Sequence, residues 1–240
     1  MSSDNLSAYL QQSRRSLIES LRQEGILKSR EVEEALSFVP REAFLDQGSQ
    51  SLAYLDEPLP IASTGQTISA PHMVAIMLEE LELQPEMKVL EIGTGSGYNA
   101  ALLGHIVSRG LSRSGNEPLV TSIERDEKLT SFAMQNIEKV GLSNIVRIVA
   151  GDGSLGYPQE SNEELYDRIT ITAGAPRVPH FLKSQLKNNG ILLAPIGGRS
   201  YQQLIKLRKR VGRDGKSEFT EEKLVDCMFV PLIGSDAHSP

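Results

Sequence analysis

The heptapeptide Glu91-Ile92-Gly93-Thr94-Gly95-Ser96-Gly97 is the most informative stretch of this sequence. It completes the short apolar run 89–92, which is typical of a buried strand. A chain that leaves a strand and immediately opens a helix must bring its backbone N–H groups close to a ligand without intervening side chains. Gly93, Gly95 and Gly97 meet this need. The heptapeptide therefore predicts a nucleotide-binding turn between a strand and a helix.

After Lys88, short apolar runs alternate with segments whose apolar residues recur at helical spacing. This alternation is the signature of βαβ units around a mostly parallel sheet, so we expect a Rossmann-like α/β fold with helices on both faces. The strand candidates are 89–92, 120–123, 145–149, 168–172 and 191–195. The helix candidates among them are 129–140, ending before Gly141, and 181–186, ending before Gly190.

The residues before the turn predict a helical N-terminal region. Apolar residues at 32, 35, 36 and 39 follow the i, i+3, i+4, i+7 pattern of a helix, and Pro40 closes it. Residues 56–71 contain prolines and a glycine that disfavour a long helix or a central strand, so we expect an irregular loop there. A second helix follows, with apolar residues at 74, 77, 78 and 81, and Pro85 marks its end.

We expect the whole chain, residues 1–240, to form one domain, because 240 residues with 39% hydrophobic content lie near the upper end of a single α/β unit. Residues 1–85 would supply the helical and loop region, and 86–240 the α/β core. At the end of the chain, 203–209 and 224–231 predict an antiparallel hairpin joined by the polar stretch 212–220. A further polar stretch, 108–118, predicts a surface loop.

The composition argues against several classes of function. A net charge of −6 leaves no basic surplus for binding nucleic acid. No apolar run is long enough to cross a bilayer, and the first residues lack the basic-then-apolar order of a secretory signal, so we expect a cytoplasmic protein without a membrane partner. Cys227 is the single cysteine and the four histidines are scattered, so we expect neither a disulfide nor a metal site.

The glycine spacing distinguishes between cofactors. Gly-x-Gly-x-Gly differs from the dinucleotide fingerprint, whose last glycine comes one residue later to seat a pyrophosphate. S-adenosyl-L-methionine carries no phosphate but has a sulfonium and an ammonium, so an acidic residue beside the turn, Glu91, suits it. Glu124 follows the second strand and can accept two hydrogen bonds from ribose hydroxyls. Asp152 follows the third strand, where it can reach the exocyclic amine of adenine.

Several motifs also resemble those of one known enzyme family. They are residues 58–73, the turn 89–98, the later motifs 151–153, 166–169 and 173–176, and the C-terminal run 229–232. In these segments the sequence resembles the protein-L-isoaspartate (D-aspartate) O-methyltransferases, and the similarity extends from about 17 to 234. The resemblance implies an S-adenosyl-L-methionine-dependent methyltransferase fold and methyl transfer to the α-carboxyl of L-isoaspartyl residues in damaged proteins, with D-aspartyl residues as further candidates. The product ester would close to a succinimide and so begin repair, leaving S-adenosyl-L-homocysteine.

The resemblance implies roles for individual residues. Ser69 falls on the position assigned to the active site, where its hydroxyl can orient a substrate carboxylate. Ser69 could equally cap a helix that begins at Ala70-Pro71, and His72 could contact the substrate or be structural. Spacing and resemblance together predict that the cofactor is bound by Gln66, Thr67, Ile68, Ser69, Glu91, Gly93, Gly95, Ser96, Glu124, Arg125, Asp152 and Gly153.

Three other functions compete with this one: a small-molecule methyltransferase, a noncatalytic cofactor-binding regulator and a nicotinamide oxidoreductase. The glycine spacing counts against the oxidoreductase. Residues 66–73 count against the other two, because neither needs that particular loop. We therefore expect an enzyme that acts as a monomer on isoaspartyl-containing proteins and peptides.

Overall fold

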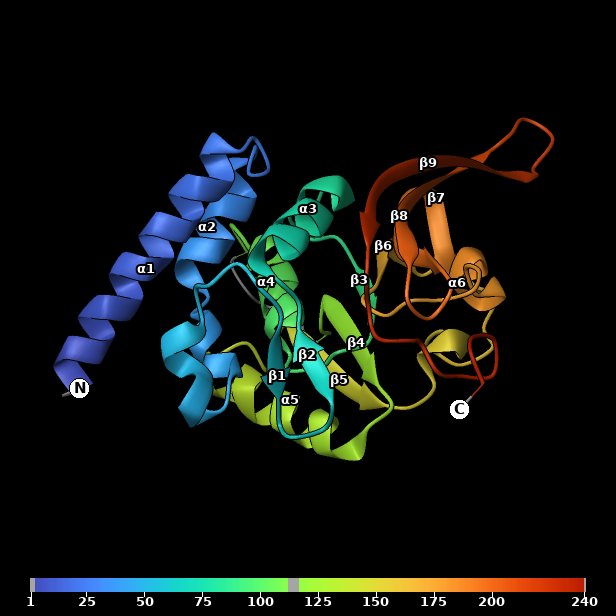
Figure 1. The fold of residues 1–240 in the computed structure, drawn as a ribbon. Coiled ribbons are helices and arrows are strands. Elements are labelled where there is room, and N and C mark those ends of the chain that lie inside the picture. The colour runs from blue at the N-terminus through green and yellow to red at the C-terminus, as the bar shows by residue number, and fades with distance from the viewer. Residues whose placement is uncertain (1–2, 112–116, 240) are drawn as a thin grey trace.

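The computed structural model describes residues 3–111 and 117–239, and a seven-stranded sheet lies at its centre (Figure 1). The strand order is β5-β4-β3-β6-β7-β8-β9. Neighbours from β5 to β7 pair in parallel, whereas β8 and β9 are antiparallel to their neighbours, so the predicted sheet and terminal hairpin are confirmed. The strands are β3 (Val89–Ile92), β4 (Val120–Glu124), β5 (Val146–Ala150), β6 (Tyr166–Ile171), β7 (Leu186–Gly197), β8 (Gln202–Val211) and β9 (Ser217–Cys227).

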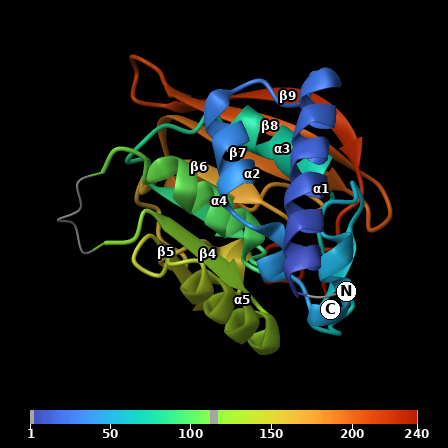
Figure 2. The same ribbon diagram turned by 90° about the vertical axis from the view of Figure 1, so that its left-hand side faces the viewer.

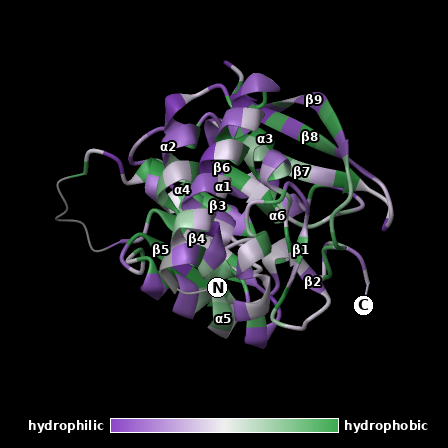
Figure 3. Cartoon of the chain, turned by 60° about the vertical axis from the view of Figure 1, so that its left-hand side comes forward, coloured by the Kyte–Doolittle hydropathy of each residue, from purple (hydrophilic) through white to green (hydrophobic). Residues whose placement is uncertain are grey.

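Helices cover both faces of this sheet. Successive side chains of a strand point to opposite faces, so neighbouring strand residues pack against different helices. Val89 belongs to a core that includes residues of α3, α4 and α5, whereas Leu90 belongs to a second core that includes Leu182 of α6. Figure 3 shows hydrophobic residues along the sheet and mixed or hydrophilic residues on the outer helices. The helices are α3 (Pro71–Leu81), α4 (Tyr98–Val107), α5 (Glu127–Lys139) and α6 (His180–Gln185).

The N-terminal segment forms a helical layer outside α4 (Figure 2). The Phe38 ring at the end of α2 stacks on His105 of α4, with ring centroids 4.6 Å apart. Ser29 caps α2, which ends just before Pro40 as predicted. Within the described residues, no helix is both long and apolar enough to span a membrane. The elements of this layer are α1 (Ser3–Gln23), α2 (Arg30–Phe38) and the 3-10 helices η1 (Arg41–Phe44) and η2 (Gln47–Leu52).

The segment 56–71, predicted to be an irregular loop, contains a small antiparallel hairpin instead. Strands β1 (Leu59–Ile61) and β2 (Gln66–Ile68) pair with each other and not with the main sheet. Proline is tolerated in such a two-stranded edge because one side of each strand needs no partner. Left-handed backbone at Ala62, Ser63 and Gly65 makes the turn. The hairpin leads directly into α3, whose prediction is confirmed.

Several predicted boundaries of the last helix and strands were wrong. Residue Leu186 begins β7 rather than ending a helix, and Gly190 lies inside that strand. Here Asp167 alone lies opposite residues 187–190, and a Cβ on Gly190 would come within 2.7 Å of Leu186, so close packing explains this glycine. The polar residues from Ser217 onward belong to β9, which ends earlier than predicted. The predicted loop 108–118 falls partly on 112–116, outside the described residues.

Candidate active site

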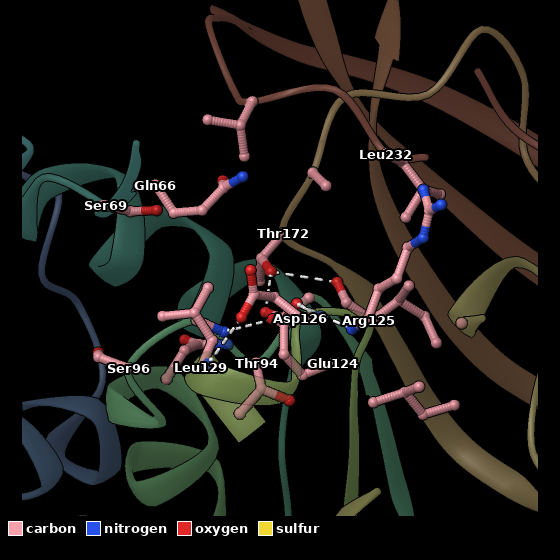
Figure 4. A pocket seen from close by; sticks show the side chains of 18 of the residues that line it. Gln66, Ser69, Thr94, Ser96, Glu124, Arg125, Asp126, Leu129, Thr172 and Leu232 are labelled. Atoms are coloured by element: carbon pink, nitrogen blue, oxygen red, sulfur yellow. Dashed lines mark hydrogen bonds between the residues drawn. The ribbon is translucent and has the colours of Figure 1, made fainter. Parts of the chain in front are cut away.

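A cavity of about 400 Å³ lies at the carboxyl ends of β3, β4 and β6, where open α/β sheets bind ligands. In Figure 4, Gln66 and Ser69 lie on one side, Thr94 and Glu124 face them from below, and Leu232 lies on a third side. The sequence-predicted residues that line the cavity are Gln66, Thr67, Ile68, Ser69, Gly93, Gly95, Ser96, Glu124, Arg125 and Gly153. Segments far apart in the sequence therefore meet around one space.

The glycine turn is shaped by left-handed backbone and by close packing. The φ angles of Gly93, Gly95 and Gly97 are 95°, 55° and 87°, a region that favours glycine. A Cβ on Gly93 would come within 2.6 Å of the Thr172 hydroxyl, so a side chain there would displace the neighbouring strand end. Glycine at this position keeps the backbone against β6 and leaves the cavity open above it.

Glu124, at the end of β4, is tied to the turn by its own carboxylate. Its Oε2 accepts a hydrogen bond from the Gly95 N–H at 2.9 Å, and its Oε1 accepts from the N–H groups of Arg125 and Asp126. A carboxylate has about four lone-pair sites, so these bonds leave acceptor capacity facing the cavity. The position is compatible with the predicted contact to ribose hydroxyls.

Glu91 lies beneath the cavity rather than in its lining. Its side chain is completely buried, and it accepts hydrogen bonds from the Ser122 hydroxyl and, at 2.7 Å, from Asn99 Nδ2. Burial raises the pKa of Glu91 to about 7, although the bonds from Ser122 and Asn99 act in the opposite direction. Because Asn99 does line the cavity, Glu91 reaches the site through this side chain.

Asp152 also lies outside the lining, and it holds the C-terminal tail. Its Oδ1 accepts from the N–H and hydroxyl of Ser154, and its Oδ2 accepts from the Ser235 N–H at 2.7 Å. Its neighbours Gly151 and Gly153 do line the cavity. The Asp152 carboxylate thus binds η3 (Gly153–Leu155) and the tail, and its contact with adenine stays a prediction.

Ser69 connects β2 to α3, and its hydroxyl does not cap that helix. The N-cap position is Ala70, with no side-chain hydrogen bond, so the capping alternative for Ser69 was wrong. Asp56 binds the first turn of α3 instead, since its Oδ1 accepts from the His72 N–H at 2.8 Å and lies 3.0 Å from His72 Nδ1. His72 is paired with Asp56 and is not part of the cavity lining.

Sequence reasoning missed part of the lining. Thr172 and Ala173 follow β6, and the rule that ligands bind at carboxyl strand ends could have identified them. The residues 230–233 overlap the motif 229–232 of the family resemblance, but that motif did not point to the cavity. They reach the cavity because Gly174 accepts from the Leu232 N–H and donates to the Val230 carbonyl. Other lining residues near the turn that were not predicted include Thr94, Tyr98, Asn99, Asp126 and Leu129.

The lone cysteine lies apart from this cavity, at the end of β9. It is half-buried, and burial together with Asp226 raises the pKa of the Cys227 thiol to about 11. A thiol with a raised pKa is a poor nucleophile at neutral pH. Among the described residues, no cluster of three or more His, Cys, Asp or Glu side chains is placed to hold a metal ion.

The fold and the cavity are those of an S-adenosyl-L-methionine-dependent methyltransferase. A solved structure of a putative protein-L-isoaspartate O-methyltransferase from Plasmodium falciparum, in complex with S-adenosyl-L-homocysteine, matches with a TM-score of 0.77 at 28% identity and covers 92% of this chain and 98% of that one. The family model described as Protein-L-isoaspartate(D-aspartate) O-methyltransferase matches residues 12–237. The chain belongs to this family.

Two further relatives support the same assignment. A protein-L-isoaspartate O-methyltransferase of Staphylothermus marinus is 47% identical over 92% of this chain and 94% of its own length. One from Pyrococcus horikoshii is also 47% identical, over 90% of this chain and 91% of its own. The family, fold class and cofactor predicted from the sequence are confirmed.

The lining residues fit this cofactor chemically. Glu124 would offer acceptors to the diol of the cofactor, Ile123 and Leu129 would offer apolar walls for its base, and Asn99, which is bonded to the buried Glu91 carboxyl, belongs to the same lining. The packing at Gly93, which a Cβ would disrupt, keeps the turn flat against the sheet. A site with a few polar groups among apolar walls is typical for small cofactors.

Proposed function

We propose that this protein methylates the α-carboxyl of L-isoaspartyl residues in damaged proteins and so initiates their repair through a succinimide. The observation that carries the proposal is that Gln66–Ser69, from the hairpin and its exit, face the glycine turn across one cavity. Among the described residues the Ser69 hydroxyl has no hydrogen-bond partner, so it is available to a substrate.

The chemistry needs alignment more than acid or base groups. Bound S-adenosyl-L-methionine supplies an electrophilic methyl group on a cationic sulfur. The substrate carboxylate is already ionised near neutral pH, so no proton has to be removed. We propose that Ser69 donates a hydrogen bond to one oxygen of the substrate carboxylate and thereby turns the other oxygen toward the methyl group. Orientation of this kind accounts for large rate effects in bimolecular reactions.

The cofactor contacts are proposed as two groups. Glu91 and Asp152 act indirectly. Glu91 is bonded to Asn99, which lines the cavity, and Asp152 is bonded to the C-terminal tail, which carries part of the cavity wall. The direct contacts are proposed for Gln66, Thr67, Ile68, Ser69, Gly93, Gly95, Ser96, Glu124, Arg125 and Gly153, all of which line the cavity.

The test compares two synthetic peptides that differ only in one linkage, isoaspartyl or normal aspartyl. The purified protein should transfer labelled methyl groups from S-adenosyl-L-methionine to the isoaspartyl peptide only. Equal labelling of both peptides, or methylation of small molecules instead, would contradict the repair assignment. A D-aspartyl version of the peptide tests whether those residues are also substrates.

The role of Ser69 has its own test. Ser69→Ala should keep cofactor affinity and lose most of its turnover, because the hydroxyl is proposed to act on the substrate only. Ser63→Ala, in the turn of the same hairpin but outside the lining, is the matched control. Unchanged turnover in Ser69→Ala would remove Ser69 from catalysis.

We further propose that the protein works as a single-domain monomer in the cytoplasm. One hydrophobic core contains residues from Leu10 in α1 to Phe229 after β9, which supports one cooperative unit. Light scattering at several protein concentrations tests the monomer, and cell fractionation tests the location.

A further inference from the structure

Arg41, the first residue of η1, is a completely buried charged side chain with no part in the chemistry above. It does not line the cavity. A charged side chain is rarely buried in full unless its hydrogen bonds are satisfied. The groups that it contacts therefore indicate its role.

Arg41 joins three segments that meet behind Ser69. Its Nη1 donates to the Ser69 carbonyl at 2.8 Å, and its Nη2 donates to the Glu57 carbonyl at 3.5 Å. Its guanidinium carbon lies 5.4 Å from the ring centroid of Tyr98, which begins α4 directly after the glycine turn. The planar guanidinium thus connects the hairpin entrance, the Ser69 loop and the cofactor turn.

All three contacts are with groups that are neutral at physiological pH. Within the described residues no carboxylate forms an ion pair with Arg41, and its Nε has no hydrogen-bond partner. Burial lowers the pKa of Arg41, but arginine stays charged at any physiological pH. The Asp56 carboxylate favours the charged form of Arg41 electrostatically but is not hydrogen-bonded to it. Because a buried charge without a hydrogen-bonded counter-ion costs stability, an apolar side chain would fill this space better if packing were the only requirement.

We propose that Arg41 is a positioning residue that holds the Ser69 backbone, and with it the Ser69 hydroxyl, where it orients the substrate carboxylate. This inference rests on the proposed catalytic role of Ser69. Among the described residues the Ser69 hydroxyl forms no hydrogen bond. The bond from Arg41 to the Ser69 carbonyl is therefore the polar contact that holds this residue in place. A displacement of about 1 Å in an orienting group can reduce turnover by about 10²-fold.

The first experiment replaces Arg41 with methionine, which fills similar space without the charge or the donors. We expect Arg41→Met to lower kcat by roughly 10- to 100-fold and to leave cofactor affinity within about threefold. Arg168→Met is the matched control, since Arg168 is also buried and donates to the backbone carbonyls of Leu81 and Glu82, away from the cavity. The control should keep kcat within about threefold of the parent value.

The second experiment combines Arg41→Met with Ser69→Ala. If Arg41 acts through the Ser69 hydroxyl, the double variant should turn over as Ser69→Ala alone does, within about threefold. A further loss equal to that of Arg41→Met alone would overturn the inference, as would full turnover in Arg41→Met. Normal turnover in Ser69→Ala would instead overturn the proposed role of Ser69.

Arg41→Lys is a second test of the same inference and replaces Arg41→Met if that variant does not fold. Lysine retains the charge but lacks the planar fork that spans two carbonyls. We expect kcat between those of the parent and Arg41→Met, with unchanged cofactor affinity. Parent-like turnover in Arg41→Lys would show that the two-carbonyl contact is not needed and would overturn the inference.

Discussion

Glu91, the buried carboxyl under the glycine turn, should make the stability of this protein depend on pH. Its pKa is about 7 in the folded chain, against an ordinary value of 4.5, because burial disfavours the charged form. Between these two pH values the folded state therefore binds more protons than the unfolded state. Stability from this group is fully present below about pH 4.5 and is lost as the pH rises through about 7.

The size of the effect follows from the same shift. One pKa unit corresponds to about 1.4 kcal/mol, so the rise from 4.5 to about 7 corresponds to about 3 kcal/mol. Glu91→Gln removes the titration and keeps the shape, and its amide can accept from Asn99 and donate to Ser122. We expect the variant to match the parent near pH 4.5 and to be more stable by up to about 3 kcal/mol at pH 8.

The assay is urea unfolding of the cofactor-free protein from pH 4.5 to 8.5, followed by circular dichroism. The difference between Glu91→Gln and the parent isolates this one group from all others that titrate. Glu218→Gln, which removes an exposed carboxylate of β9, controls for the change in net charge. Parallel pH profiles for Glu91→Gln and the parent would refute the reasoning.

Two further predictions concern the turn and the tail. Gly93→Ala should cost about 1–3 kcal/mol of stability and weaken cofactor binding at least about tenfold, since it adds strain at positive φ and a close contact with Thr172. Calorimetry measures both effects. The control is Gly25→Ala, where φ is also positive but no atom lies close, and an equal loss of stability in the two variants would contradict the close-contact argument. Asp152→Ala should speed hydrogen exchange of the Ser235 amide by about tenfold or more, because that amide loses a charge-assisted bond, and unchanged exchange by NMR would argue against Asp152 as the anchor of the tail.

The elements with clear apolar periodicity were predictable because that signal is local. Strand β3 coincides with the predicted run 89–92, and α5 coincides closely with the predicted helix before Gly141. The start of β9 was not predictable in this way. Its first residues are exposed in an arm that projects beyond the core (Figure 1), so neither face requires apolar side chains.

The same contrast applies within the site. The backbone requirements of a turn are visible in the local sequence. The glycines at 93–97, together with the acidic residues at successive strand ends, indicated a nucleoside cofactor, and the segments from 58–73 to 229–232 together resembled the family. The direction and partners of a side chain are not local. Glu91 bonds to Ser122 on the neighbouring strand, and Asp152 bonds to Ser235 in the tail. Only the tertiary structure decided that these two residues lie outside the cavity lining while Glu124 lies in it.

Arg41 is the clearest case of what required the folded chain. In the sequence it follows a helix-ending proline and carries no motif that points to the active site. The fold buries it against the Ser69 carbonyl and the Tyr98 ring, which come from separate segments. The sequence determined the fold class and the cofactor, because these depend on local backbone geometry and apolar period, and the resemblance of its motifs indicated the family. The tertiary structure decided which polar groups reach one another, because burial and hydrogen bonding join residues that are distant along the chain.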